Sequence, residues 1–185
     1  MNFMKTFLAA LAAGFLLAAT PGFATQTDPL LDELFERLRT TEDPVEAENL
    51  QEHIWQLWIE TENKKIMDLF ARCRELMLRD DYATALDLVS EIVEIDPNHA
   101  EGWNLRATIF YAIGDYESSI EDVERTLALE PRHFGALVGL GMMYVDMGED
   151  AKALAAFERA LAVNPHLEQA RRQIQEIKQR VGGSV

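Results

Sequence analysis

Cysteine is almost absent from this chain. Its 185 residues include one cysteine, Cys73. A single thiol cannot form a disulfide within the chain, so packing alone must hold the fold together in any compartment. Cys73 falls at a position where two helices are expected to touch, and we predict a buried structural thiol rather than a reactive one.

Basic residues are also scarce. The chain has 17 Lys and Arg against 32 Asp and Glu, a formal net charge of −15 that becomes −16 once a leader containing Lys5 is removed. Such a chain repels phosphate backbones and anionic head groups. We therefore predict no nucleic-acid partner, and either a basic protein partner or an acidic surface that serves solubility alone.

Long hydrophobic runs are limited to one near the start. Lys5 precedes an apolar run over residues 7–19, and small residues stand at Gly22 and Ala24. The run is too short to span a bilayer, which argues against an uncleaved anchor. The pattern predicts a secretory signal peptide over residues 1–24, cleaved after Ala24, and export to a bacterial periplasm. We predict no integral membrane segment in the mature chain.

Motifs for catalysis or metal binding are missing. The sequence has no nucleophile-elbow glycine–serine pattern, no phosphate-binding loop and no zinc-ligand spacing. His99, His133 and His166 fall in different predicted loops, and His53 stands alone on a predicted helix. We expect loop histidines, no metal, no cofactor and no catalytic residues, so the chain is predicted not to be an enzyme.

A 34-residue period organises most of the chain. Pro97, Pro131 and Pro165 are spaced at this interval, and each ends a helical run because proline disfavours helix at the residue before it. In this register the segments 66–99, 100–133 and 134–167 align without a gap. A fixed period of this length is the signature of a repeat architecture.

The aligned columns have consistent chemistry. Small residues share two columns where helices must touch: Cys73, Ala107 and Gly141; Ala85, Ser119 and Ala153. Large apolar residues fill the core columns: Leu69, Trp103 and Leu137; Leu76, Phe110 and Tyr144; Val89, Val123 and Phe157; Val93, Leu127 and Leu161. The turn column holds Asp80, Gly114 and Gly148. Glycine suits a left-handed helix end, so we expect a looser turn at Asp80.

These columns resemble those of the tetratricopeptide repeat (TPR) family. The resemblance covers about 100 of the 185 residues and rests on helix, turn and terminal-proline positions: Trp103, Ala107, Phe110, Gly114, Asp115, Tyr116, Ser119, Leu127 and Pro131. Arg72 and Arg106 depart from it, in a column that is often leucine. The resemblance implies an all-α fold, an α-solenoid of three TPR helix–turn–helix repeats.

Segments outside the period flank the repeats. Residues 25–63 predict a helical hairpin, with start signals at Asp28-Pro29 and Asp43-Pro44. It either stacks on the first repeat as an N-terminal cap or folds into the concave groove of the solenoid. Residues 168–181 predict a C-terminal capping helix whose apolar face carries Ala170, Ile174, Ile177 and Val181.

The resemblance also implies a concave groove lined by the first helix of each repeat. Carried onto this sequence, its candidate partner-binding residues are Phe70, Arg74, Met77, Asn104, Leu105, Thr108, Tyr111, Val138 and Met142. The lining is mostly apolar and suits an amphipathic helix or an extended apolar segment. The lysine with which some family members clamp a chaperone's C-terminal carboxylate is missing. Gly135 and Gly139 either serve tight packing or let a partner backbone approach.

Two functional hypotheses follow. The first is a non-enzymatic adaptor or scaffold that binds a peptide, a helix or another protein in the periplasm, with Phe70, Met77, Leu105, Tyr111, Val138 and Met142 burying its apolar face. The second is a structural assembly factor for a cell-envelope complex, in which the hairpin fills the groove.

Overall fold

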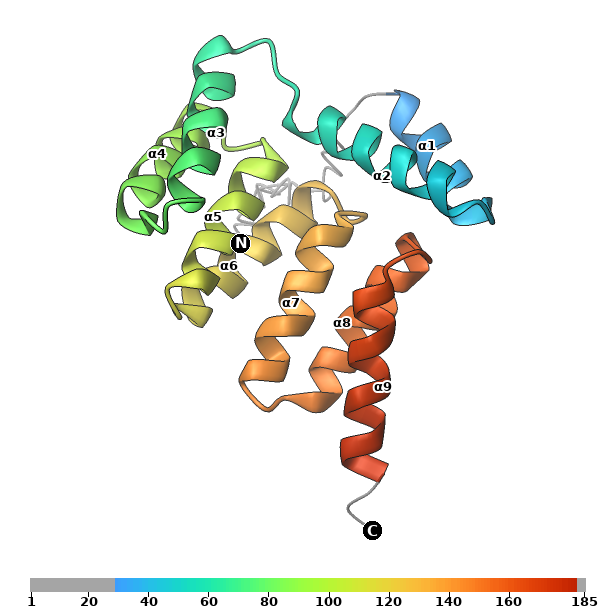
Figure 1. Ribbon diagram of the computed structural model, residues 1–185. Coiled ribbons are helices and arrows are strands. Elements are labelled where there is room, and N and C mark those ends of the chain that lie inside the picture. Colours follow the sequence, from blue (N-terminus) through green and yellow to red (C-terminus); the bar gives the residue numbers. More distant parts are fainter. Residues whose placement is uncertain (1–28, 183–185) are drawn as a thin grey trace, which may run out of the picture.

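The computed structural model describes residues 29–182, and helices are its only regular secondary structure there (Figure 1). The predicted signal peptide, residues 1–24, lies outside the described residues. The all-α prediction is confirmed for the described range. The helices are α1 (Pro29–Thr40), α2 (Pro44–Ile59), α3 (Lys64–Met77), α4 (Tyr82–Ile95), α5 (Ala100–Ala112), α6 (Tyr116–Leu129), α7 (Phe134–Asp146), α8 (Asp150–Val163) and α9 (Glu168–Gly182).

Short polar side chains start several of these helices. The Asp43 carboxylate accepts the Val45 N–H at 2.9 Å, and Pro44 occupies the first helical position of α2. Asn63 caps α3 in the same manner. Asp81 caps α4 and its repeat-mate Asp115 caps α6. Each cap satisfies a backbone donor that the helix itself leaves unpaired, so the sequence specifies these helix starts locally.

Each repeat turns through one residue in the left-handed region. Gly114 and Gly148 have φ of 83° and 74°, and Asp80 adopts the same conformation with φ of 56°. The Asp81 N–H donates to the Leu76 carbonyl at 3.0 Å, and the equivalent bonds in the next two repeats measure 2.9 and 2.8 Å. The expected looser turn at Asp80 is therefore wrong, because the same hydrogen bond closes all three turns.

The three helix pairs α3–α4, α5–α6 and α7–α8 stack in sequence order, and α9 packs along α8 (Figure 1). The small-residue columns are buried at the pair contacts, as predicted: Cys73, Ala107 and Gly141; Ala85, Ser119 and Ala153. Cys73 is fully buried, and burial raises the pKa of its thiol to about 11, which keeps it protonated and unreactive. The predicted inner face of α9 is buried at Ala170, Ile174 and Ile177.

The hairpin of α1 and α2 takes neither of its two expected positions. Its apolar face packs against Phe134 at the start of α7. Val163 and Leu167, on either side of the α8–α9 loop, pack against the same cluster. The hairpin thus lies across the loops that connect successive repeats, over the distal half of the solenoid (Figure 1). It neither stacks on repeat one as a preceding pair nor fills the concave face.

Gly135 explains part of this placement. A β-carbon built on Gly135 would lie 2.9 Å from the Trp55 ring of α2, so the absence of a side chain lets the hairpin approach. Of the two readings of Gly135, tight packing within the fold is the one observed, and its neighbour is Trp55 of the hairpin. At Gly139 a β-carbon would meet nothing within 4 Å.

Candidate functional site

The hairpin is held by a ring stack at the junction of repeats two and three. The Trp58 indole and the His133 imidazole are nearly parallel, with centroids 4.0 Å apart, and both side chains are fully buried. The His133 Nδ1 accepts the Ala136 N–H at 3.1 Å and so caps α7. Its Nε2 therefore carries the proton and donates to Glu101 Oε2 at 2.9 Å.

Of the other two loop histidines, His166 contacts the hairpin and His99 packs within the repeats. The Nε2 of His166 donates to the Leu38 carbonyl of α1 at 3.1 Å. The buried His99 caps α5 by accepting the Gly102 N–H, and its ring packs on Phe70. Burial lowers the pKa of His99 below its ordinary value, although Asp96 and Glu101 oppose that shift. The prediction that these histidines lie in loops is confirmed, and His133 and His166 also hold the hairpin, a role that the sequence pattern did not indicate.

Polar contacts complete the docking of the hairpin. Arg132 donates to Asp32 of α1 at 2.6 Å and lies over the Phe35 ring at 4.4 Å. The Asn164 amide donates to Gln51 of α2 at 2.9 Å. These bonds come from the loops before α7 and α9. They fix the direction in which α2 crosses the solenoid.

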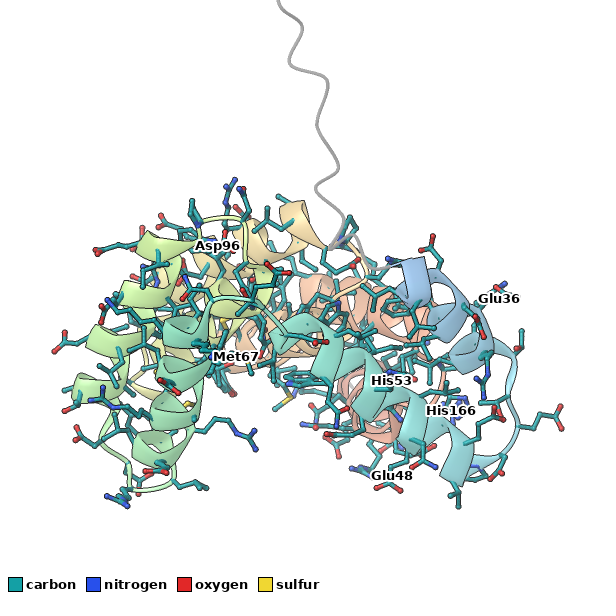
Figure 2. The ribbon with its side chains drawn as sticks, turned by 90° about the horizontal axis from the view of Figure 1, so that it is seen from above. Glu36, Glu48, His53, Met67, Asp96 and His166 are labelled. Carbon is teal, nitrogen blue, oxygen red and sulfur yellow. The ribbon has the colours of Figure 1, made fainter. Side chains whose placement is uncertain are left out.

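Between α2, α3 and α5 lies a cleft with a volume of about 950 Å³. The helices α2 and α3 do not pack along each other, so the cleft stays open between them. Figure 2 shows Met67 on the side of α3 that faces α2. The lining residues are Glu52, Trp55, Gln56, Ile59 and Glu60 from α2 and its end, Met67, Phe70, Arg74, Met77 and Leu78 from α3 and its end, and Glu101 and Leu105 from α5.

Four of the predicted binding residues line this cleft: Phe70, Arg74, Met77 and Leu105. Phe70 and Leu105 are buried in the core cluster around the first repeat. They therefore form the floor of the cleft. Met67 and Leu78 stand at the mouth and are 38% and 87% exposed. An exposed apolar rim above an apolar floor is what a docking surface presents to a partner.

The predicted polar residues of repeat two are engaged within the fold instead. The Asn104 amide donates to Glu101 at 3.0 Å, and the Thr108 hydroxyl donates to the Asn104 carbonyl at 2.9 Å. The Tyr111 hydroxyl donates to Asp146 of the next repeat at 2.7 Å. Burial, and then this bond, raise the pKa of Tyr111 to about 12. None of the three lines the cleft.

Val138 and Met142 also lie apart from the cleft. Both pack with Phe157, Ile174 and Ile177 in the cluster that joins repeat three to α9. The Gln169 amide of α9 contacts the Met142 sulfur at 3.8 Å. The last helix thus covers part of the concave surface that the resemblance implied would be open.

The α2 wall was not predicted as part of a site. It contributes Trp55 and Ile59 one helical turn apart, with Glu52 and Glu60 on its rim. The cleft therefore brings three carboxylates, counting Glu101, against the single guanidinium of Arg74. Its electrostatic character is negative along α2 and positive at one point on α3.

Residues 29–182 were searched by geometry for metal ligands and by hydropathy for membrane spans. No three His, Cys, Asp or Glu side chains there gather as metal ligands would. None of the helices in that range combines the length and apolar character needed to cross a bilayer.

Comparison with known proteins identifies the repeats. The profile of the tetratricopeptide repeat family matches residues 104–168. A TPR repeat-containing protein of Rhizobium etli is 30% identical over 154 residues, which cover 83% of this chain and 76% of that protein.

Two solved structures share the fold. The first TPR of Spaghetti (RPAP3), bound to an HSP90 peptide, superposes with a TM-score of 0.62 at 18% identity, over 67% of this chain and 98% of that chain. MamA superposes with a TM-score of 0.60 at 22% identity, over 80% and 84%. Together with the gapless 34-residue period, these comparisons show that the chain belongs to the tetratricopeptide repeat family.

Proposed function

We propose that this chain is a non-enzymatic protein-interaction module that binds a polypeptide segment in the cleft between α2, α3 and α5. The observation that carries the proposal is the cleft itself, an apolar floor of Phe70 and Leu105 beneath the exposed rim residues Met67 and Leu78. Burying apolar side chains of a partner there removes apolar surface from water on both sides. A related fold, the first TPR of Spaghetti, carries an HSP90 peptide.

Clamping of a terminal carboxylate is not part of this proposal. The cleft contains no lysine, and the Asn104 amide already donates to Glu101. Arg74 is the sole cation among the lining residues. The partner's apolar side chains, rather than its terminus, supply the binding energy.

We further propose that the chain acts after export to a bacterial periplasm. The support is the sequence pattern of Lys5, the apolar run over residues 7–19 and the small residues before Thr25. Expression of the full chain in a Gram-negative host, followed by fractionation and N-terminal sequencing, tests this. A periplasmic product starting at Thr25 is expected, and an intact cytoplasmic product would contradict export.

A peptide-display selection tests the binding proposal. The chain from Thr25 to Val185 is immobilised, peptides are selected from a random library, and the strongest is titrated against variants. Met67→Gln with Leu78→Gln, which makes the rim polar, is expected to weaken binding about tenfold or more, roughly 1.4 kcal/mol. The matched control is Ile113→Gln with Met147→Gln, because these residues end the first helices of repeats two and three and are 51% and 46% exposed.

The two double variants have distinct expected outcomes. The rim variant loses the selected peptide while the control variant keeps it, and both retain the parental melting temperature because all four residues are exposed. Equal loss in both variants, or undiminished binding by the rim variant, would contradict a site in this cleft.

A further inference from the structure

We infer that the cleft selects an amphipathic helix with a basic edge, seated with its cations toward α2. The inference rests on the proposed function and specifies the chemistry of its partner. Three features of the lining carry it: its small number of neutral hydrogen-bonding groups, the two carboxylates on its α2 side that form no ion pair, and the length of its two walls.

The shortage of free polar groups favours a helix over an extended strand. An extended segment buried in the cleft would bring backbone N–H and C=O groups that need partners, and leaving each unpaired is costly. Apart from ionisable side chains, the lining offers only the indole N–H of Trp55 and the amide of Gln56, and that amide already donates to Glu52. A helix satisfies its own backbone and presents only side chains.

The rim carboxylates favour cations on that helix. Glu52 and Glu60 are exposed and form no ion pair with a lysine or arginine within residues 29–182. Glu52 lies on α2 and Glu60 caps its C-terminal end eight residues later, about 12 Å along the helix axis. A lysine or arginine at each end of a partner's basic edge can reach both. The net charge of −15 adds a field that attracts such a partner from a distance.

The α3 wall determines on which side of the cleft the cations of the partner lie. Arg74 on α3 is exposed and repels a second cationic face, so the basic edge belongs beside α2. Along α3 the lining runs from Met67 to Leu78, about 16 Å of helix. The site therefore accommodates about eight to eleven residues, or about two to three turns of a partner helix.

The apolar stripe of the partner has a defined place. Trp55 and Ile59 line the α2 side of the cleft, and Met67 and Met77 line the α3 side, above the floor of Phe70 and Leu105. Residues spaced three and four apart on each wall form ridges between which the side chains of a third helix can pack. Methionine on the α3 wall adapts to different apolar shapes.

The probes are three synthetic peptides of 18 residues. The first places leucines at helical spacing with lysines on the remaining faces, and the second replaces every lysine with glutamate. The third is the lysine peptide with two central prolines, which prevent a helix. Fluorescein-labelled peptides are titrated with the mature chain at 150 mM salt and followed by fluorescence anisotropy.

Charge exchange in the chain provides the matched comparison. Glu52→Lys with Glu60→Lys alters the cleft, and Glu42→Lys with Glu48→Lys makes the same change in net charge at exposed residues outside it. The lysine peptide is expected to bind the parent about tenfold tighter than the other two peptides. The cleft exchange should abolish that preference, and the control exchange should retain it.

Each alternative result has a definite meaning. Equal binding of the lysine and glutamate peptides, or equal effects of the two charge exchanges, overturns the basic-edge inference. Full binding by the proline peptide overturns the helix inference, and binding by none of the peptides overturns both. These results leave the proposed function to be judged by the display selection, because a selected peptide sensitive to Met67→Gln with Leu78→Gln would still mark the cleft as a binding site.

Discussion

Trp58 of the hairpin lies flat against His133 of the repeat junction, with ring planes only 14° apart. The same imidazole caps α7 through Nδ1 and donates to Glu101 through Nε2. One side chain thus links the hairpin, the start of α7 and the α5 residue at the cleft floor. The position of the cleft wall depends on this contact.

Truncation of Trp58 is expected to release the hairpin. Trp58→Ala removes a fully buried ring from the hairpin core, and such truncations cost about 3–5 kcal/mol. Urea unfolding measures the loss, and amide hydrogen exchange should show faster exchange in α1 and α2 than in α7. Trp103→Ala, a half-buried indole of repeat two, is the control that should leave hairpin exchange unchanged. If amide exchange in α1 of the Trp58 variant stayed at the parental rate, the stack of Trp58 on His133 would not be what holds the hairpin.

Two glycines of α7 are expected to respond oppositely to alanine. A β-carbon on Gly141 would lie 2.5 Å from the Phe157 ring, so Gly141→Ala overpacks the core and should cost about 1–3 kcal/mol. A β-carbon on Gly139 meets nothing within 4 Å, so Gly139→Ala should stabilise the helix by up to about 1 kcal/mol. Thermal melting compares the two. A stabilised Gly141→Ala protein would show that Phe157 moves aside freely.

Acid is expected to destabilise the fold through His99. Its pKa is lowered below the ordinary 6.5 by burial, so the unfolded state binds more protons as the pH falls. The neutral, buried form of His99 therefore contributes its full stabilisation to the folded state above about pH 6.5. This contribution is lost as the pH falls toward the lowered pKa of His99 in the folded state. Urea midpoints at pH 7.5 and 5.5 are compared for the parent and His99→Asn, which keeps an acceptor for the Gly102 N–H.

The His99 variant should lose stability less steeply than the parent between those pH values. Exposed His53 on α2 supplies the control, since His53→Asn should preserve the parental difference. A His99→Asn protein with the full parental pH dependence would assign the effect to other groups.

The first turn is expected to gain from glycine. Asp80 has φ of 56°, a conformation that costs an L-residue about 1–2 kcal/mol. Asp80→Gly should therefore stabilise the chain by about 1 kcal/mol, reduced by the loss of the exposed 2.9 Å bond from the Tyr82 hydroxyl. Gly148→Asp, the reverse change in repeat three, should lower the melting temperature by about 2–4 °C. Melting temperatures that move in the opposite directions would contradict this interpretation.

The repeats could be predicted from sequence because their packing is local. Ser119 donates to the Ala107 carbonyl only 12 residues earlier, and in repeat one Cys73 donates to the Ala85 carbonyl at the same spacing. The hairpin position could not be predicted in this way. Gln51 meets Asn164 across 113 residues and Leu38 meets His166 across 128, with no periodic pattern to reveal either pairing. Gly135 was the one sequence signal of a close neighbour.

In the candidate site too, the residues set by local repeat packing could be predicted, and those set by the hairpin could not. Phe70, Met77 and Leu105 were found because repeat positions place them on first helices. Trp55 and Ile59 were missed because their role depends on the non-local docking of α2. Val138 and Met142, predicted for the same groove, lie outside the cleft and pack in the cluster that joins repeat three to α9. The terminal elements decide which part of the concave surface stays available.

Because α2 both docks on His133 and forms one wall of the cleft, occupancy of the cleft and closure of the hairpin are thermodynamically linked. A ligand that contacts the α2 wall stabilises only the form of the protein in which the hairpin is docked. This stabilisation grows with the ratio of the ligand concentration to its Kd. The stability of the docked hairpin then reports whether the cleft is occupied. Amide exchange in α1 and α2 is therefore expected to slow when a partner is bound, even though neither Trp58 nor His133 lines the cleft.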